Sequence, residues 1–531
     1  MVDLILLNLS YLIILIYFIY KLKHGFHIYQ LEYYKHNRYK LWRKKNPDAV
    51  IKIRDLSLLF SGLFLIINFR VGAILNLIFA IFLWFSRDIY PEKTKLNWTK
   101  RIKISFTLSI LVFMTFAIAA NVFGFKGLED AINVALLSLM NFIVSIITIL
   151  IMYFLILISD FIQIFENRKN KKFYKKAKEK LESMPDLKIV GITGSYGKTS
   201  VKSILATLLK QKYNTFMTPG NYNTLLGVQR SINEHLKSTD EVFVCEMGAK
   251  EVGSIAKICD LVKPQVGVLT AIGPQHLETF GSLNNIKRAK MELIDSIPGD
   301  GIKIVNYENE NIRDATDGLD VTKYGLDEKD DFYAYNIEIT DKGSKFDIHT
   351  PDGDIKEIKT KLIGKLNIIN IVGAVAAAKM MGVSSEEIKT GLRFLNPINH
   401  RLELNKYSDG SIVIDDAYNS NIEGAANAFQ TLKLFKDKFK IIVTPGLVDL
   451  GDSSNKYNKE FGRRAAGCAD LYILVGEKQA KAIKEGLLEE DVPAEKICIV
   501  DTINNAINKY NEYEASNRVV LLENDLPDNY L

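Results

Sequence analysis

The residues from Val190 to Ser200, with the sequence VGITGSYGKTS, have the composition of a phosphate-binding loop. An apolar run enters a glycine-rich turn, and Lys198-Thr199 opens a stretch of helical character. Backbone N–H groups of such a turn and the positive end of the helix dipole attract phosphate oxygens. The lysine can reach the β- and γ-phosphates, and the threonine hydroxyl can bind Mg²⁺.

The strict G-x-x-x-x-G-K-[ST] pattern is not met, because Ile192 replaces its first glycine. A short turn before a helix is also a common structural element, but Gly-Lys-Thr between a strand and a helix favours triphosphate binding. The residues expected to contact the nucleotide here are Gly194, Ser195, Gly197, Lys198, Thr199 and Ser200.

Four further polar positions follow the loop. Glu246 ends the strand Val242–Cys245, where a carboxylate can face Mg²⁺ held by phosphates. His276 and Asp416 follow other strand ends, and Lys290 lies in a helical stretch. Taken singly, each has an ordinary explanation as a solvated strand end, a structural histidine or a surface lysine. Together they indicate one shared site.

Apolar strands alternate with helical patterns after residue 186, which is typical of mostly parallel sheets flanked by helices. Residues 332–360 instead predict a small antiparallel excursion with Asp-Gly turns. Removing the first 183 of 531 residues leaves about 350, too many for one average domain. The break near Pro397–His400 predicts two α/β domains, over 186–398 and 399–531, with ligands in the cleft between them.

Residues 1–165 contain five apolar runs: Leu4–Tyr20, Leu56–Phe69, Val71–Ser86, Ile104–Phe125 and Ala131–Ile158. The first and the last two are long enough, or nearly so, to cross a hydrocarbon core of about 30 Å. The two short runs flank Arg70 and predict a tight membrane hairpin or a re-entrant pair. We expect a transmembrane region of about five helices over 1–165, followed by a basic linker helix over 166–185.

The charges of the loops predict the orientation of these spans. Residues 21–54 carry ten Lys or Arg against two acidic residues, residues 87–103 carry six, and residues 168–180 carry eight. The positive-inside rule then places the N-terminus outside and everything after residue 165 in the cytoplasm. The sequence predicts a multi-pass protein of the cell membrane whose basic segments either contact lipid headgroups or only direct topology.

Charge divides the chain in two. Residues 1–183 hold 26 Lys/Arg and 12 Asp/Glu, a net charge of +14, and the remainder holds 42 and 50, a net charge of −8. An acidic soluble part gives no support to nucleic-acid binding. The four cysteines, at positions 245, 259, 468 and 498, lack metal-ligand spacing and indicate reduced thiols.

From about residue 186 to 525 the chain resembles the Mur ligases, the ATP-dependent amide ligases of cell-wall precursor synthesis, and within them the MurF branch, which adds D-alanyl-D-alanine. The resemblance rests on seven blocks in family order: GITGSYGKTSVK at the phosphate loop, TPGNYNTLLGV at 218–228, CEMGAKEVGSI at 245–255, TAIGPQHLETFGSLNNIKRAKMEL at 270–293, GKLNIIN at 364–370, HRLE at 400–403 and VIDDAYNSN at 413–421. It implies a P-loop central domain and a Rossmann-like C-terminal domain. Leu366 departs from the G-x-H-N pattern common in MurF.

The resemblance also implies a role for each position. Lys198 and Thr199 would hold the ATP phosphates and a first Mg²⁺, with Glu246 on the same ion. His276 would ligate a second Mg²⁺. Lys290 matches a lysine that many members carbamylate with CO₂, which turns a cation into a metal-facing carboxylate. Contacts to adenine, phosphates and ribose would come from Asn367, Arg401 and Asp416, in that order, so Lys198, His276 and Lys290 are the expected catalytic residues.

The implied chemistry has two steps. A substrate carboxylate attacks the γ-phosphate of ATP to give an acyl phosphate, and an amine then displaces phosphate to form an amide. The protein positions the reactants and neutralises their charge. The C-terminal domain would bring the amine donor, an amino acid or a dipeptide. Its loop Thr444–Gly451 resembles the corresponding MurF segment and either lines the amine site or is a structural strand-to-helix turn.

The N-terminus departs from the family, because membrane spans replace the small domain that binds the UDP part of the acceptor. We therefore expect a small-molecule or lipid-linked carboxylate acceptor, with membrane lipids as partners. Two alternatives stay open: a poly-γ-glutamate-type synthase, and a membrane scaffold with a degenerate Mur domain that only binds nucleotide.

Overall fold

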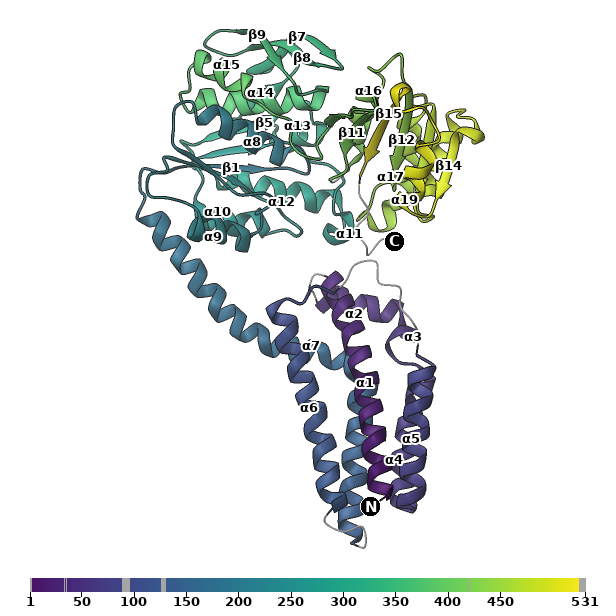
Figure 1. Ribbon diagram of the computed structural model, residues 1–531. Helices are drawn as coiled ribbons and strands as arrows, with labels where there is room; N and C mark the ends of the chain where they lie inside the picture. Colours follow the sequence, from purple (N-terminus) through teal and green to yellow (C-terminus); the bar gives the residue numbers. More distant parts are fainter. Residues whose placement is uncertain are drawn as a thin grey trace. The chain divides into compact units, whose positions relative to one another are not determined.

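The computed structural model describes residues 2–32, 34, 36–87, 96–125, 130–418 and 420–524, which form two compact units (Figure 1). Unit 1 covers Met1–Asn170 and unit 2 covers Lys171–Leu531. Residues 88–95 and 126–129, which belong to the loops that predict membrane orientation, lie outside the described residues. So do residues 525–531, at the end of the predicted second domain. The basic segment expected as a separate linker helix over 166–185 is instead mostly the C-terminal part of α7, which runs unbroken over Ala131–Glu182.

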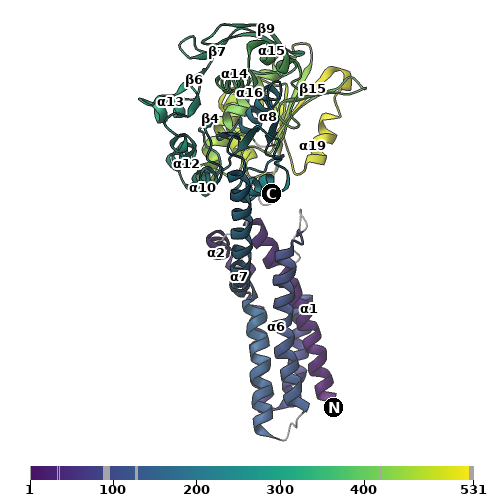
Figure 2. The same cartoon turned by 90° about the vertical axis from the view of Figure 1, so that its left-hand side faces the viewer.

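Unit 1 is entirely helical in its described part, as the pattern of apolar runs predicts (Figure 2). Its helices are α1 (Val2–Leu31), α2 (His36–Lys45), α3 (Pro47–Val50), η1 (Ile53–Leu56), α4 (Ser57–Ile67), α5 (Phe69–Phe85), α6 (Lys100–Phe125) and α7. Among the described residues, three segments have the length and apolar character to cross a membrane: Val2–Leu31, Lys100–Phe123 and Ala131–Asp160. All five apolar runs are therefore helices, but α4 and α5 are shorter than a full span.

Helices α4 and α5 form a tight hairpin. Asn68 separates them and caps α5, because its side chain accepts a hydrogen bond from the Val71 backbone N–H at 3.2 Å. At Gly72 the helices approach so closely that a Cβ atom would lie 2.4 Å from the backbone nitrogen of Leu65. A glycine is needed here because any side chain would push α4 away.

Buried polar groups join three helices of unit 1. The Asn76 amide of α5 donates to Ser10 Oγ of α1 at 2.9 Å and to Asn141 Oδ1 of α7 at 3.1 Å. All three residues are fully buried. Hydrogen bonds of this kind fix which helix faces meet in an apolar environment, where packing alone discriminates weakly.

Unit 2 contains a nine-stranded sheet in the order β2-β3-β1-β4-β5-β6-β7-β8-β9. Strands β2 to β7 pair in parallel, and β7, β8 and β9 form the predicted antiparallel excursion as an extension of the same sheet. The strands are β1 (Lys188–Thr193), β2 (Thr215–Met217), β3 (Val242–Glu246), β4 (Val266–Leu269), β5 (Ile302–Asn306), β6 (Thr322–Gly325), β7 (Phe332–Thr340), β8 (Gly343–His349) and β9 (Ile355–Thr360).

Helices cover both faces of this sheet, and each face has its own buried cluster. The helices are α8 (Lys198–Leu209), α9 (Leu225–Glu234), α10 (Ser254–Val262), α11 (Leu277–Phe280), α12 (Leu283–Ser296), α13 (Glu310–Thr316), α14 (Lys365–Met380) and α15 (Ser385–Arg393). Helices α8, α14 and α15 pack on one face, and α10 and α12 pack on the other. The arrangement is a doubly wound α/β fold, which places ligands at the carboxyl ends of its strands.

A second sheet follows in the order β10-β11-β15-β12-β13-β14, parallel except for β10. Its strands are β10 (Glu403–Lys406), β11 (Ile412–Asp416), β12 (Phe439–Thr444), β13 (Leu471–Val475), β14 (Ile497–Val500) and β15 (Arg518–Glu523). Its helices are α16 (Ile422–Leu432), η2 (Gly451–Ser453), α17 (Ser454–Ala465), α18 (Ala480–Glu489), η3 (Ala494–Lys496), α19 (Ile503–Tyr510) and η4 (Ala515–Asn517). Two α/β domains are thus present, as predicted.

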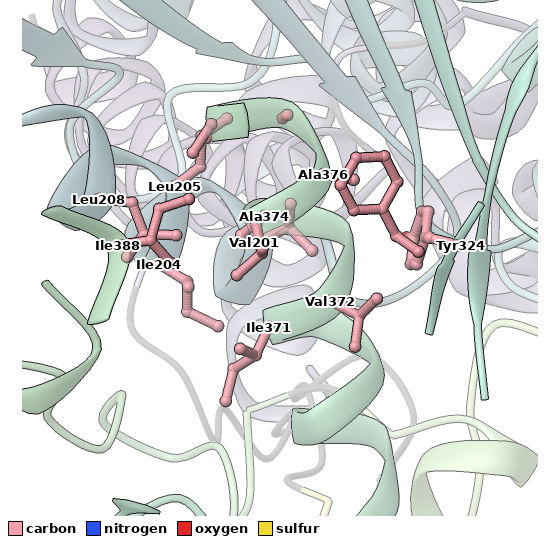
Figure 3. Packing of buried hydrophobic residues seen from close by; sticks show 14 of the residues in the cluster. Val201, Ile204, Leu205, Leu208, Tyr324, Ile371, Val372, Ala374, Ala376 and Ile388 are labelled. Carbon is pink, nitrogen blue, oxygen red and sulfur yellow. The ribbon is translucent and has the colours of Figure 1, made fainter. Parts of the chain in front are cut away.

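The core behind the phosphate loop is formed by α8 and α14 (Figure 3). Val201, Leu205 and Leu208 of α8 are fully buried with Ile371 and Val372 of α14. The start of α8 carries the phosphate loop, so this packing holds the loop against the sheet.

Replacing Ile371 by Ala should lower the free energy of unfolding of unit 2 by about 2–5 kcal/mol, because the buried side chain leaves a cavity. Met380→Ala on the same helix is the matched control, since Met380 is 43% exposed, and should change stability by less than about 0.5 kcal/mol. Thermal unfolding of the full chain followed by circular dichroism compares the two. Equal effects would contradict this account of the core.

Candidate active site

The turn between β1 and α8 has the backbone of an anion-binding loop. Gly194 and Gly197 have φ angles of +158° and +82°, and Gly197 stands at the N-cap of α8. No side chain caps this helix, so its first N–H groups are left for a ligand. The sequence prediction of a loop leading directly into a helix is confirmed.

Contacts to the end of β4 fix the shape of the loop. Ser195 Oγ donates to the Gly273 carbonyl at 3.0 Å, and the Ser195 N–H donates to the Ala271 carbonyl at 2.7 Å. The Thr270 hydroxyl donates to the Tyr196 carbonyl. A Cβ atom on Gly194 would lie 2.1 Å from Thr270 Oγ1, so glycine is required there. The hydroxyl and the N–H of Ser195 therefore both support the loop, and the expected contact of Ser195 with a nucleotide stays a prediction.

Lys198 lies folded onto the loop. Its Nζ donates to the carbonyls of Gly194 at 2.6 Å and Ser195 at 3.1 Å. Burial, with a smaller contribution from Arg401, lowers the pKa of Lys198 to about 8 against the opposing charge of Glu246. A buried ammonium next to a second cation favours an anion, which would restore its charge.

Glu246 at the end of β3 is the most heavily bonded group of the site. Its Oε2 accepts from Thr199 Oγ1 at 3.2 Å and pairs with Lys202 Nζ at 2.9 Å, and its Oε1 accepts from Asn223 at 2.9 Å. Burial alone would raise the pKa of Glu246, but Lys202 and Lys198 outweigh it and hold that pKa below its usual range. The carboxylate is therefore charged and lies beside Thr199.

Lys202 and Asn223 were missed by the sequence reasoning, although both lie in the motif blocks quoted above. Lys202 follows Lys198 by four residues, which places the two on one face of α8. Asn223 lies in the loop before α9. The spacing of Lys202 from Lys198 was visible in the sequence. Lysine and asparagine occur in many structural and surface positions, so spacing alone does not identify these two as site residues.

Lys290 of α12 is buried, with 4% of its surface exposed. Within the described part of the chain its ammonium has no hydrogen-bond or ion-pair partner. Burial, with a contribution from Lys198, holds the pKa of Lys290 well below its usual range, against the opposing charges of Glu292 and Glu246. A surface lysine is thus excluded, and Lys290 is a buried amine whose charged form is disfavoured.

His276 does not contact the Thr199–Glu246 group directly. Its Nδ1 lies 2.5 Å from Oδ2 of Asp449, in the loop after β12 of the second domain. The Glu278 N–H donates to the Asp449 carbonyl at 3.2 Å, so both ends of this aspartate join the two domains. A carboxylate on Nδ1 orients the ring and leaves Nε2 as the nitrogen that could ligate a cation.

The remaining predicted residues come from α14 and from the second domain. The Asn367 side chain donates to the Ile363 carbonyl at 2.9 Å in the first turn of α14. The Arg401 guanidinium stacks on the Tyr418 ring at 4.6 Å. Asp416 Oδ1 accepts from the Leu402 N–H at 3.2 Å, and burial raises the pKa of Asp416 to about 6 against the pull of Arg401.

Few side chains of this site can ligate a metal ion. Within the described residues, no group of three or more His, Cys, Asp or Glu side chains is placed to hold one. Thr199 and Glu246 supply two oxygen ligands, which suits Mg²⁺ because this ion takes few protein ligands and keeps phosphates and waters. The set fits Mg²⁺ bound together with a phosphate ligand, and a carbamate on Lys290 would add oxygens.

Two family models match consecutive parts of the chain: the Mur ligase middle domain at residues 192–378 and the Mur ligase glutamate ligase domain at 400–523. A MurF crystal structure from Acinetobacter baumannii is 30% identical, has a TM-score of 0.60, and is covered over 76% of its length by 66% of this chain. The chain belongs to the Mur ligase family. All the predicted site residues lie within or beside the two matched regions.

Two further relatives bear on the function of this Mur ligase. UDP-N-acetylmuramoyl-tripeptide–D-alanyl-D-alanine ligase of Escherichia coli (strain K12) is 32% identical over 302 residues, which are 56% of this chain and 66% of that protein. The MurF ligase from Thermotoga maritima, solved in complex with ADP, is 26% identical with a TM-score of 0.60, and the match covers 67% of this chain and 80% of that one. The chain spans 66% or less of the length of the curated relatives it matches, and helical unit 1 lies before the matched regions.

Replacing Lys202 of this Mur ligase by Met should destabilise unit 2 by about 3–5 kcal/mol, because Glu246 is left buried without its partner. Lys210→Met, at the exposed C-cap of the same helix, is the matched control. Thermal unfolding at pH 7 measures both variants. A Lys202 variant as stable as the control would show that Lys198 and Asn223 alone hold the carboxylate.

Lys290 should make the stability of unit 2 depend on pH. Its pKa is lower in the folded chain than the 10.5 of an ordinary lysine, so the unfolded chain binds more protons between those two values. Stability should therefore rise as pH increases toward 10.5, and Lys290→Met should be more stable than the wild type at pH 7, with a flatter dependence. Thermal midpoints from pH 7 to 9.5 test this; parallel curves for the two proteins would contradict it.

Proposed function

We propose that the chain is an ATP-dependent ligase that forms a C–N bond through an acyl phosphate, in the manner of MurF, for a cell-envelope precursor such as that of peptidoglycan. The observation that carries the proposal is the convergence of an uncapped helix N-terminus, Lys198, Thr199 and Glu246 at one sheet edge. The MurF relatives, one of them solved with ADP, support it.

The loop supplies what a nucleotide triphosphate requires. ATP bound there would provide the phosphoryl group that activates a carboxylate, and Mg²⁺ on Thr199 and Glu246 would neutralise its charge. Lys198 holds two loop carbonyls at 2.6 and 3.1 Å and would exchange them for phosphate oxygens. Because Glu246 is fixed by three side chains, its carboxylate needs little rearrangement to receive the ion.

The state of Lys290 supports carbamylation. The reaction with CO₂ uses the uncharged amine, and burial beside Lys198 favours that form. The uncharged amine would attack CO₂ and release a proton to solvent, which gives a carbamate anion. Its negative charge would lie near Lys198, whose positive charge disfavours the protonated form of Lys290. The product would complete a ligand set that Thr199 and Glu246 begin.

The second domain would supply the remaining positioning groups. Arg401 lowers the pKa of Lys198, so its positive charge acts at the phosphate loop although it belongs to the other domain. Asp449 binds His276 across the same boundary, and it belongs to the Thr444–Gly451 loop, which would line the amine site. Both contacts would bring the amine toward the activated carboxylate.

We further propose that the ligase works at the cytoplasmic face of a membrane on a membrane-held acceptor. Three helices of unit 1 have the length and composition of spans, and unit 1 precedes the matched regions. Amino acids or dipeptides would serve as donors. A nucleotide-binding scaffold is disfavoured because Lys198, Thr199, Glu246 and Lys290 are all side chains competent for the reaction.

Purified full-length protein in detergent should release ADP only when a suitable acceptor and amine are both present. We expect Lys198→Ala to lower turnover by at least about a hundredfold, since a phosphate-neutralising group is lost. Lys210→Ala is the matched control. UDP-linked and lipid-linked acceptors should be compared with D-alanyl-D-alanine and single amino acids as donors.

The same assay tests the carbamate. Lys290→Ala should be inactive and should regain part of its turnover with short carboxylic acids, which can take the place of the carbamate. Absence of ADP release from every acceptor tried would favour the scaffold. Preferred turnover of soluble UDP-linked tripeptide would remove the membrane-held acceptor, and repeated addition of glutamate would favour a poly-γ-glutamate-type synthase.

A further inference from the structure

Helix α14 has a glycine at its N-cap position. Gly364 has a φ angle of +96° and no side chain that could accept a hydrogen bond from the start of the helix. The first N–H groups of a helix have no partner inside the helix, so they need one from elsewhere. The Leu366 N–H donates to Oδ1 of Asn427 at 3.2 Å, and Asn427 lies on α16 of the second domain. An asparagine oxygen is among the preferred caps of a helix N-terminus.

The second domain holds Asn427 in place. Its neighbours Ala428 and Phe429 on α16 are fully buried in the core of that domain, while the Asn427 side chain contacts the start of α14. The backbone carbonyl of Asn427 accepts from Thr431 Oγ1 at 2.9 Å. The position of the capping oxygen therefore follows the position of the second domain.

The two helices meet so closely that glycine is needed at the contact. A Cβ atom on Gly364 would lie 2.8 Å from Nδ2 and 3.1 Å from Oδ1 of Asn427, and 3.1 Å from Thr431 Oγ1. The Asn427 side chain is buried, and within the part of the chain that the structure describes its Nδ2 has no hydrogen-bond partner. The polar contribution of this side chain therefore comes from its acceptor oxygen.

The first turns of α14 carry residues of the candidate nucleotide site. Asn367, the residue expected to contact adenine, directly follows Leu366, and its side chain is fixed on the Ile363 carbonyl at 2.9 Å. Asn370 lies against the phosphate loop, because a Cβ atom on Gly197 would lie 2.8 Å from Asn370 Oδ1. A shift of the start of α14 would therefore move both asparagines relative to the loop.

We propose that Asn427 is a positioning residue for nucleotide binding, which holds the start of α14 in place from the second domain. Because the adenine contact of Asn367 belongs to the proposed function, the role of Asn427 rests on that function as well. When the second domain moves away, the Leu366 N–H loses its acceptor and the first turn of α14 frays. Loss of the cap lowers nucleotide affinity, and by linkage a bound nucleotide favours docking of the second domain by the same factor.

Calorimetric titration of the full-length protein in detergent with ADP and Mg²⁺ measures the effect on nucleotide affinity. Asn427→Leu has a similar shape but no acceptor, and should weaken ADP binding by about fivefold, the effect of losing a helix cap. Asn427→Asp keeps an acceptor oxygen whose charge is favourable at a helix N-terminus, and should bind ADP within about twofold of the wild type. Gln430→Leu, exposed on the same helix, is the matched control and should leave binding unchanged.

Amide hydrogen exchange without nucleotide tests the cap directly. In Asn427→Leu, residues 364–370 should exchange faster than in the wild type, while exchange over 422–432 should stay the same because α16 keeps its packing. Should Asn427→Leu fail to fold, Asn427→Ser, whose side chain is too short to reach the Leu366 N–H, should show both effects.

Unchanged exchange over 364–370 would overturn the proposal. Equal weakening of ADP binding by the Asp and Leu variants would also overturn it, since shape rather than the acceptor would then matter, and so would equal loss in Gln430→Leu. Absence of ADP binding by the wild type would overturn both this role of Asn427 and the proposed function. ADP binding without ligation would leave the role of Asn427 standing and count against the ligase alone.

Discussion

The buried ion pair between Lys202 and Glu246 is the interaction on which the candidate active site depends. Both side chains are almost fully enclosed, and the largest stabilisation of the Glu246 charge comes from Lys202, whose ammonium lies 2.9 Å away. The pair joins the first helix after the phosphate loop to the end of the neighbouring strand. It thereby fixes the distance between Thr199 and the carboxylate, which together form the oxygen ligands for a cation.

Burial is the main cause of the lowered pKa values of Lys198 and Lys290. Glu246 opposes that lowering at both lysines, while its own charge is held mainly by Lys202. Arg401 adds to the lowering at Lys198, and Lys198 adds to it at Lys290. Phosphate oxygens bound beside these buried lysines would stabilise their charged forms.

Much of this arrangement could be predicted from the sequence, and the reasons for the failures are physical. Glu246 and the turn before Lys198 follow from local patterns, since a strand end and a glycine-rich turn have clear signatures. The pairing of His276 with Asp449 joins positions 173 residues apart, and no local pattern contains it. The burial of Lys290 was likewise invisible, because a lysine in a helix is usually exposed. The length of α7 was underestimated because the change from apolar to basic composition at its end resembles a boundary, while helix propensity continues across it.

The contact between Gly194 and Thr270 has a consequence for how this family can vary. A methyl group at position 194 would collide with the hydroxyl that fastens the loop to β4, and the positive φ angle already disfavours any side chain. The two positions are therefore not independent units of evolution. A sequence with a side chain at position 194 also needs a smaller residue at position 270. A sequence without the threonine needs another hydrogen bond to hold the loop in this shape.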